Sequence, residues 1–125
     1  MIDGIDRIEI DFLPPRANEF ERGKWHWRAL TKEFRTRLEV ELWGQRIYRV
    51  SGFVRVDVVV AGRADLDARL KALFDGLQHI GAFADDAQIE VAPIRRLRVK
   101  VPWKLRVRWS ACQPTDLAEV DQWFA

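Results

Sequence analysis

The segment Gly52–Ala61 constrains the fold of this chain more strongly than any other segment. It contains five valines and ends in the uninterrupted apolar run Val58–Ala61. A β-branched segment of this kind favours a strand, and a near-continuous apolar run is typical of a strand in the middle of a sheet. Gly62 interrupts the pattern, and apolar residues at helical spacing over Leu66–Ile80 then predict a helix that Gly81 closes.

Two segments before this strand also have the period of regular elements. Residues Ile5–Phe12 alternate between apolar and charged, which predicts a half-buried strand that ends at Pro14–Pro15. Thr31 is a plausible N-cap for a helix that runs to about Trp43 and has a buried apolar stripe. Residues 16–29 show no sustained period, so we expect a long loop there, with aromatic residues among cations.

The last third of the chain alternates again. The segments Leu97–Val101 and Leu105–Trp109 predict two neighbouring strands joined near Pro102, which form a hairpin with a basic outward face. Thr115 can cap a short final helix that docks onto the domain or onto a partner subunit. The expected order β-α-β-α-β-β, with two main helices, gives a single small α+β domain with a mixed β-sheet over residues 1–125.

Composition excludes several classes of protein. With 48% hydrophobic and 32% charged residues, the chain is expected to be globular rather than disordered. No apolar run is long enough to span a bilayer, and no basic segment followed by an apolar stretch predicts a secretory signal. A single Cys112 cannot form an internal disulfide, which fits a reducing cytoplasm. The two histidines have no zinc-site spacing.

The charges are distributed unevenly along the chain. The segment Val91–Trp109 carries seven basic residues and no acid, although the formal net charge of the whole chain is only +2. Such a segment can bind a polyanion such as DNA, or it can form the solvated face of a hairpin. Charge alone leaves these two interpretations open.

Carboxylates lie at both ends of the predicted helix Leu66–Ile80. Asp65 and Asp67 stand at its start, and Asp85–Asp86 follow it. If residues 65–67 are extended, the first two carboxylates point the same way, and if they are already helical, the two carboxylates diverge by about 200° around the axis. We expect the turn after Gly81 to bring the second pair back towards the start of the helix, where three carboxylates would suit Mg²⁺ or Mn²⁺ rather than zinc. Lys71 could stabilise charge on a phosphate, or it could simply bridge Asp67 and Asp75 along the helix. Acidic pairs also arise as caps and in loops.

The order of these residues resembles a known signature. The run DLDARLKALFDGL (residues 65–77), followed by GAFADDAQI (residues 81–89), is similar to the motif D-L-D-N-x-x-K-x-x-x-D-x-L and then D-D-x-Q-[VI] of the RusA family of Holliday junction resolvases. The run PPRAN (residues 14–18) also resembles the P-P-x-x-N loop of that family. The likeness extends over residues 5–110, and its specific part is the central run 65–89.

The resemblance implies a function and a set of site residues. RusA-type enzymes are Mg²⁺-dependent homodimeric endonucleases, often encoded by phages and prophages, that cut paired strands at four-way DNA junctions in recombination and repair. The resemblance places metal-binding aspartates on Asp65, Asp67 and Asp86, and the essential lysine on Lys71, with Mn²⁺ as a substitute for Mg²⁺. Ala68 stands where the family has asparagine, so the hydrogen bonds of that amide are absent. A cytoplasmic location, in a bacterial or phage-infected cell, is expected.

Basic and polar residues around these positions are expected to contact four-way or other branched DNA, mainly through its phosphates. They are Arg16, Asn18, Lys24, Arg63, Arg69, Arg96, Arg98 and Lys100. Two other functions stay open. The chain could be a non-catalytic module that binds branched DNA with the same fold, or a metal-dependent hydrolase of nucleotides or RNA.

Overall fold

The valine-rich segment forms the central strand of a mixed five-stranded sheet. The structure is a computed structural model that describes residues 3–17 and 23–125. Strand β2 (Val54–Ala61) pairs antiparallel with β5 (Leu105–Ala111), which pairs antiparallel with β1 (Arg7–Ile10) at one edge. On its other side β2 pairs in parallel with the short strands β3 (Ile89–Val91) and β4 (Ile94–Leu97).

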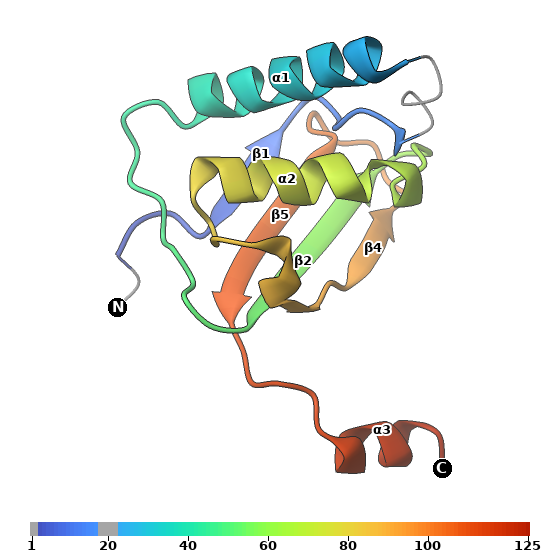
Figure 1. Cartoon of the computed structure of the whole chain (residues 1–125). Coiled ribbons are helices and arrows are strands. Elements are labelled where there is room, and N and C mark those ends of the chain that lie inside the picture. The colour runs from blue at the N-terminus through green and yellow to red at the C-terminus, as the bar shows by residue number, and fades with distance from the viewer. Residues whose placement is uncertain (1–2, 18–22) are drawn as a thin grey trace.

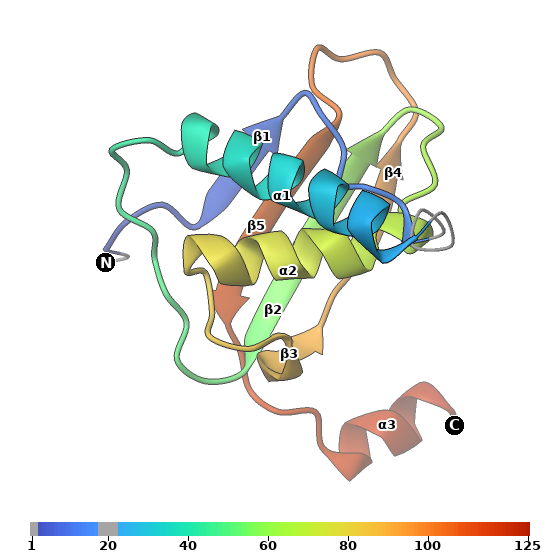
Figure 2. The same ribbon diagram turned by 45° about the horizontal axis from the view of Figure 1, so that its top comes forward.

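Two long helices cover the same face of this sheet, as Figures 1 and 2 show from two directions. Helix α1 (Lys24–Glu41) and helix α2 (Leu70–Ile80) pack on the buried residues of β2 and β5, which alternate along each strand. The outer face of the sheet carries charged side chains instead, including the ion pairs Arg55–Asp57 and Arg106–Glu9. The core is therefore a single layer between the two helices and one face of the sheet.

The expected small α+β domain with a mixed sheet is confirmed, and the structure adds one short strand, β3, to the expected order. The predicted helix after the turn that carries Asp65 and Asp67 (the acidic turn) is also confirmed. Helix α2 is followed by Gly81, which adopts a left-handed conformation (φ 95°) and ends it. The preceding turn of 3₁₀ helix, Asp67–Arg69, leads directly into α2.

The predicted loop over residues 16–29 is wrong in its second half, because α1 already begins at Lys24. Thr31 is not an N-cap but lies inside the helix, where its hydroxyl donates to the carbonyl oxygens of Trp27 (3.0 Å) and Arg28 (3.1 Å). The first turn of α1 projects from the core and Trp25 is 79% exposed, so this turn has no apolar stripe that could mark it as helical.

The predicted basic hairpin does not form. Strand β4 pairs with β2, whereas β5 lies on the other side of β2, so β4 and β5 are not neighbours. The chain between them crosses the end of β2, where the Ala61 amide donates to the Lys104 carbonyl and the Gly62 amide donates to the Leu97 carbonyl. Arg98 and Lys100 lie in this connection rather than on a strand.

The C-terminal helix α3 (Leu117–Trp123) stands away from the rest of the domain (Figures 1 and 2). Its N-cap is Asp116 rather than Thr115, since the Asp116 carboxylate accepts from the Glu119 amide at 2.9 Å. The Leu117, Trp123 and Phe124 side chains are exposed, so the expected docking onto the same domain is not observed. Among the described residues, no helix combines the length and the apolar character needed to cross a membrane.

Candidate metal and DNA site

Strand β2 delivers the chain to a turn that begins at Gly62, whose φ of 85° favours glycine. Arg96 of β4 holds this turn through its guanidinium group. The group donates to the carbonyl oxygen of Gly62, and Nη2 donates to that of Ala64 at 2.8 Å. Asp65 follows immediately and is exposed. The turn therefore presents a carboxylate at the carboxyl end of the central strand.

Asp65 and Asp67 are both exposed, and Leu66 between them is 3% exposed and packs into the core. The Leu66 backbone has helical angles (φ −82°, ψ −30°), so the extended arrangement, in which both carboxylates would point the same way, does not form. Buried Leu66 anchors this turn, and the carboxylates of Asp65 and Asp67 point in different directions but are both accessible to a cation with its water shell. Oxygen donors of this kind suit Mg²⁺ or Mn²⁺.

Lys71 is exposed and is the second residue of α2. It follows Asp67 by four residues, a spacing that places both on one side of a helix. In the part of the chain that the structure describes, Lys71 forms no ion pair with Asp67 or Asp75. The ladder that would give this lysine a purely structural role is therefore absent, and its ammonium group faces solvent near the acidic turn.

Asp86 lies at the opposite end of β2. Asp85 caps the 3₁₀ turn Asp86–Gln88, and the Asp86 amide donates to Oε1 of Gln78 at 3.2 Å. Gln88 donates to the carbonyl oxygens of Val50 (3.1 Å) and Gly52 (2.8 Å), just before β2 begins. The eight residues of β2 span about 26 Å at ~3.3 Å per residue.

The expectation that the turn after Gly81 brings Asp85–Asp86 back to the start of the helix is therefore wrong. Strand β3 runs parallel to β2, so the chain after α2 must return to the end where β2 starts. One chain carries Asp65 and Asp67 in a single turn and Lys71 at the start of α2, whereas Asp86 lies at the far end of β2. Within residues 3–17 and 23–125, no three or more Asp, Glu, His or Cys side chains are grouped so that they could hold a metal.

Several of the predicted cationic residues lie at the same end of β2 as the acidic turn. Arg63 is exposed in the turn itself, and Arg98 and Lys100 are exposed in the connection that crosses this end of the sheet. Arg69 is half-buried, and its Nη1 donates to the Pro14 carbonyl at 2.7 Å. Arg69 thereby ties the acidic turn to the segment after β1, where Arg16 is exposed.

The remaining members of the predicted DNA-binding set differ in their positions. Lys24 is exposed at the first residue of α1. Arg96 is engaged by the carbonyl oxygens of the acidic turn, so it positions this turn rather than offering a free cation to DNA. Asn18 lies outside the described residues. Sequence reasoning missed the roles of Arg96 and Gln88, because both are defined by backbone carbonyls that are distant in the sequence.

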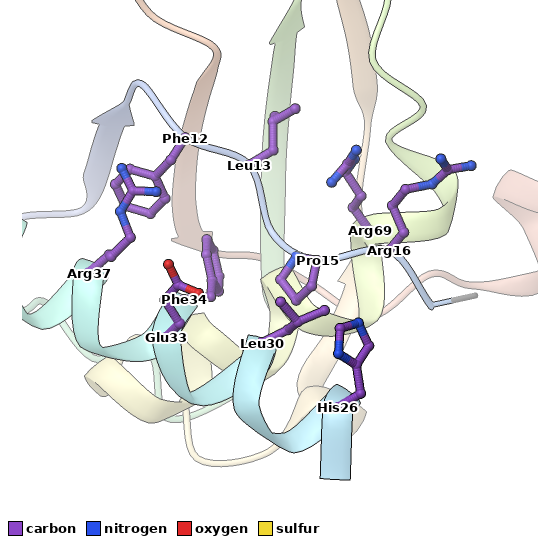
Figure 3. A pocket seen from close by; sticks show the side chains of 10 residues that line it. All are labelled: Phe12, Leu13, Pro15, Arg16, His26, Leu30, Glu33, Phe34, Arg37 and Arg69. Carbon is purple, nitrogen blue, oxygen red and sulfur yellow. The ribbon is translucent and has the colours of Figure 1, made fainter. Parts of the chain in front are cut away.

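A hollow of about 380 Å³ lies beside Arg69, between the segment after β1 and helix α1 (Figure 3). Leu30 and Phe34 form part of its wall, and they belong to the apolar stripe Leu30, Phe34, Leu38 and Leu42, whose spacing alone predicts only a buried core position. The side chains that line the hollow are Phe12, Leu13, Pro15, Arg16, His26, Leu30, Glu33, Phe34, Arg37 and Arg69.

Comparison with known proteins finds no family model that matches this chain and no curated protein with significant sequence similarity. The functional inference therefore depends on the residues of the site. These are a pair of exposed carboxylates at the carboxyl end of the central strand, a nearby lysine and a group of surrounding cations.

Proposed function

We propose that this protein is a divalent-cation-dependent endonuclease that cuts four-way and other branched DNA in recombination and repair. The observation that carries the proposal is the exposed pair Asp65 and Asp67 at the end of β2, with the exposed cations Arg63, Arg98 and Lys100 at the same end. Carboxylates bind a hard cation, and the cations around them attract the phosphodiester backbone. The proposed setting is the cytoplasm of a bacterial or phage-infected cell.

The chemistry assigned to each residue follows from its position. Asp65 and Asp67 would hold Mg²⁺, with Mn²⁺ as a substitute, and the bound ion supplies an activated water and a charge that neutralises the phosphate oxygens. Lys71 would stabilise negative charge that develops on the scissile phosphate. The cations around the turn would bind DNA through its phosphates, so sequence preference would come from only a few contacts.

Asp86 can join this site only from a second copy of the chain, because within one chain β2 separates it from the acidic pair. A homodimer with two-fold symmetry offers two equivalent sites to a junction, which suits paired cuts. We therefore assign the third metal ligand to Asp86 of a second copy.

Mixing two inactive variants tests this arrangement. If Asp86 acts across the dimer, heterodimers of Asp67→Asn and Asp86→Asn contain one intact site and one doubly altered site, so mixing restores cleavage of one strand. If Asp86 acts within its own chain, every site carries one altered ligand and the mixture stays inactive. Restored nicking therefore supports the assignment, and an inactive mixture with proven heterodimers contradicts it.

The second candidate function is a branched-DNA-binding module without catalysis. Two observations favour it: Ala68 replaces the asparagine of the resembled motif, and the described residues of one chain include no group of three or more Asp, Glu, His or Cys side chains that could hold a metal. Such a module would bind junctions with steep salt dependence and would not nick them in Mg²⁺ or Mn²⁺.

A cleavage assay distinguishes these functions. Four-way, three-way and linear DNA are compared with and without Mg²⁺ for the native chain, for Asp67→Asn and for the control Asp121→Asn on helix α3. We expect the native chain and the control to cut branched DNA only with the cation, and Asp67→Asn to bind the junction without cutting it. Cleavage by Asp67→Asn at the native rate would contradict the assignment of the site. Equal cleavage of linear DNA or RNA would favour a less selective hydrolase.

A further inference from the structure

The hollow beside Arg69 has an apolar floor and a cationic rim. Leu30 and Phe34 of α1, together with Pro15, form the floor, and Phe12 packs edge-to-face against Phe34 with ring centroids 5.8 Å apart. A floor of this kind suits a flat, weakly hydrated ring. With a volume of about 380 Å³, the hollow lies near the lower limit of small-molecule sites and has room for one nucleotide rather than for a duplex.

The rim is positively charged. Among the described residues, Arg16, Arg37 and Arg69 line the hollow, His26 adds an imidazole, and Glu33 adds a carboxylate. Arg37 has a role already, because its guanidinium lies 3.9 Å from the centre of the Phe12 ring and 4.0 Å from an Asp11 carboxylate oxygen. In Figure 3, Arg16 and Arg69 lie towards one end of the hollow, and Phe12 with Arg37 towards the other. The charge therefore favours an anionic ligand.

The hollow lies beside the turn that carries Asp67, although neither Asp65 nor Asp67 is among the described residues that line it. Arg69 ends the 3₁₀ turn that Asp67 begins, and its bond to the Pro14 carbonyl places it in the wall of the hollow. A ligand whose phosphate meets Arg16 and Arg69 would therefore lie next to the position proposed for the scissile phosphate. Among the described residues, Arg69 connects the apolar floor of this hollow with the acidic turn.

We propose that this hollow binds one unstacked nucleotide of the DNA substrate, next to the phosphate that is cut. Its base lies on the floor formed by Leu30, Pro15 and Phe34, and its phosphate is held by Arg16 and Arg69. The inference rests on the proposed function and adds a reason for branch selectivity. A nucleotide at a branch point is unstacked at lower cost than one inside a duplex, so a site that requires an extruded base favours branched DNA.

The first test uses 2-aminopurine, which fluoresces more strongly when it is unstacked, at each branch-point position of a four-way junction. The protein is added with Ca²⁺ in place of Mg²⁺, so that the junction stays intact. We expect the native chain to raise the fluorescence several-fold at one position. Leu30→Gln and Arg16→Gln should weaken this rise about tenfold in apparent affinity, the order of change expected when a bound base loses its platform.

Matched controls are available on the same helix. Leu42→Gln changes a half-buried leucine of the same stripe at the far end of α1, and Arg28→Gln removes an exposed cation outside the hollow. Both controls should keep the native rise. If all four variants behave alike, or if the native chain produces no rise, the nucleotide site is wrong. Arg16 is exposed, so Arg16→Gln remains informative even if Leu30→Gln fails to fold.

A second measurement separates this inference from the proposed function. Deoxynucleoside 5′-monophosphates, deoxyribose 5-phosphate and inorganic phosphate are titrated into the native protein while the Leu30 methyl signals are followed by NMR. We expect the monophosphates to bind at least several-fold more tightly than the two ligands without a base, and equal binding of all three would overturn the inference. Nucleotide binding at Leu30 without any DNA cleavage would contradict the endonuclease alone. Normal junction cleavage without nucleotide binding would contradict the nucleotide site in the hollow and would leave the endonuclease proposal intact.

Discussion

Arg96 and Ala64 are joined by a hydrogen bond of 2.8 Å from the guanidinium Nη2 to the backbone carbonyl oxygen. A second hydrogen bond from the same side chain reaches the carbonyl of Gly62. Strand β4, which carries Arg96, thereby holds the turn that presents Asp65. The planar, two-pronged guanidinium can bridge both carbonyls, whereas a lysine ammonium on its flexible stem cannot hold them in the same fixed geometry.

Replacing Arg96 with Lys should therefore separate positioning from charge. Arg96→Lys keeps the positive charge but loses the two-pronged contact, so we expect junction cleavage to fall about tenfold while junction affinity stays within about twofold. Single-turnover cleavage and gel-shift titration measure the two quantities. The control Arg98→Lys changes a neighbouring exposed arginine and should alter neither quantity. Cleavage by Arg96→Lys at the native rate would show that Arg96 acts only through its charge.

Gln88 offers a test of the far end of β2. Its Oε1 accepts from the amides of Ala84 and Asp85, while its Nε2 donates to the carbonyls of Val50 and Gly52. Gln88→Glu would place a carboxylate oxygen against both carbonyls, and we expect the free energy of unfolding at pH 7 to fall by about 1–3 kcal/mol. Urea titration measures this change.

The pH dependence of that variant has a defined sign. The carbonyls favour the protonated form of the introduced carboxyl, so its pKa in the folded state is raised. The loss of stability should therefore shrink as the pH falls from 7 through this raised pKa, and it should level off below about 4.3, the ordinary pKa of glutamate in the unfolded chain. Gln78→Glu is the control, because Oε1 of Gln78 only accepts, from the Asp86 amide, and a carboxylate keeps that role. A loss of equal size at both positions would contradict this explanation.

The elements that could be predicted from sequence are those set by local pattern. The valines of β2, the helical spacing of α2 and the left-handed Gly81 act within a few residues of themselves, and the structure agrees with each of these predictions. The start of α1 was missed because its first turn is largely exposed and so lacks the apolar stripe that reveals a helix.

The predictions that the structure contradicts concern contacts between residues that are distant along the chain. Alternation in residues 97–109 suggested a hairpin, but period two shows which face of a strand is buried and not which strand it pairs with. The same limit affected the candidate site. Asp65 and Asp67 are local to one turn, whereas the position of Asp86 depends on the parallel pairing of β3 with β2. The sequence separation between Arg96 and the acidic turn does not predict the hydrogen bonds between them.

Gly76 of α2 faces the Phe34 and Leu38 side chains of α1 at close range. A Cβ atom at this position would lie 2.8 Å from Cε2 of Phe34 and 2.9 Å from Cδ1 of Leu38. Gly76→Ala gains helix propensity of about 1 kcal/mol, but overpacking costs about 1–3 kcal/mol, so we expect net destabilisation. Gly52→Ala, where no atom lies within 4 Å of the new Cβ, should change the free energy of unfolding by less than about 0.5 kcal/mol. Greater stability of Gly76→Ala in urea would show that α1 can shift without cost.

Cys112 should react slowly with alkylating reagents. Burial raises the pKa of its thiol, the charge on Glu90 adds to the increase, and Arg55 opposes it. The thiolate is the reactive form, so the pH midpoint of iodoacetamide labelling, followed by mass spectrometry, should lie above that of the unfolded chain. Glu90→Gln should lower the midpoint, and Arg55→Gln should raise it. Shifts of the same sign in both variants would contradict this account.

Strand β2 is hydrogen-bonded on both edges and its inward side chains are fully buried, whereas α3 stands in solvent. Amide protons of β2 should therefore exchange with solvent only when the whole domain unfolds, while those of α3 should exchange within local fluctuations. Asp65 and Asp67 follow directly from the slowest-exchanging strand. The strand that leads into the two carboxylates is therefore fixed, and their remaining freedom is that of the exposed turn that Arg96 holds.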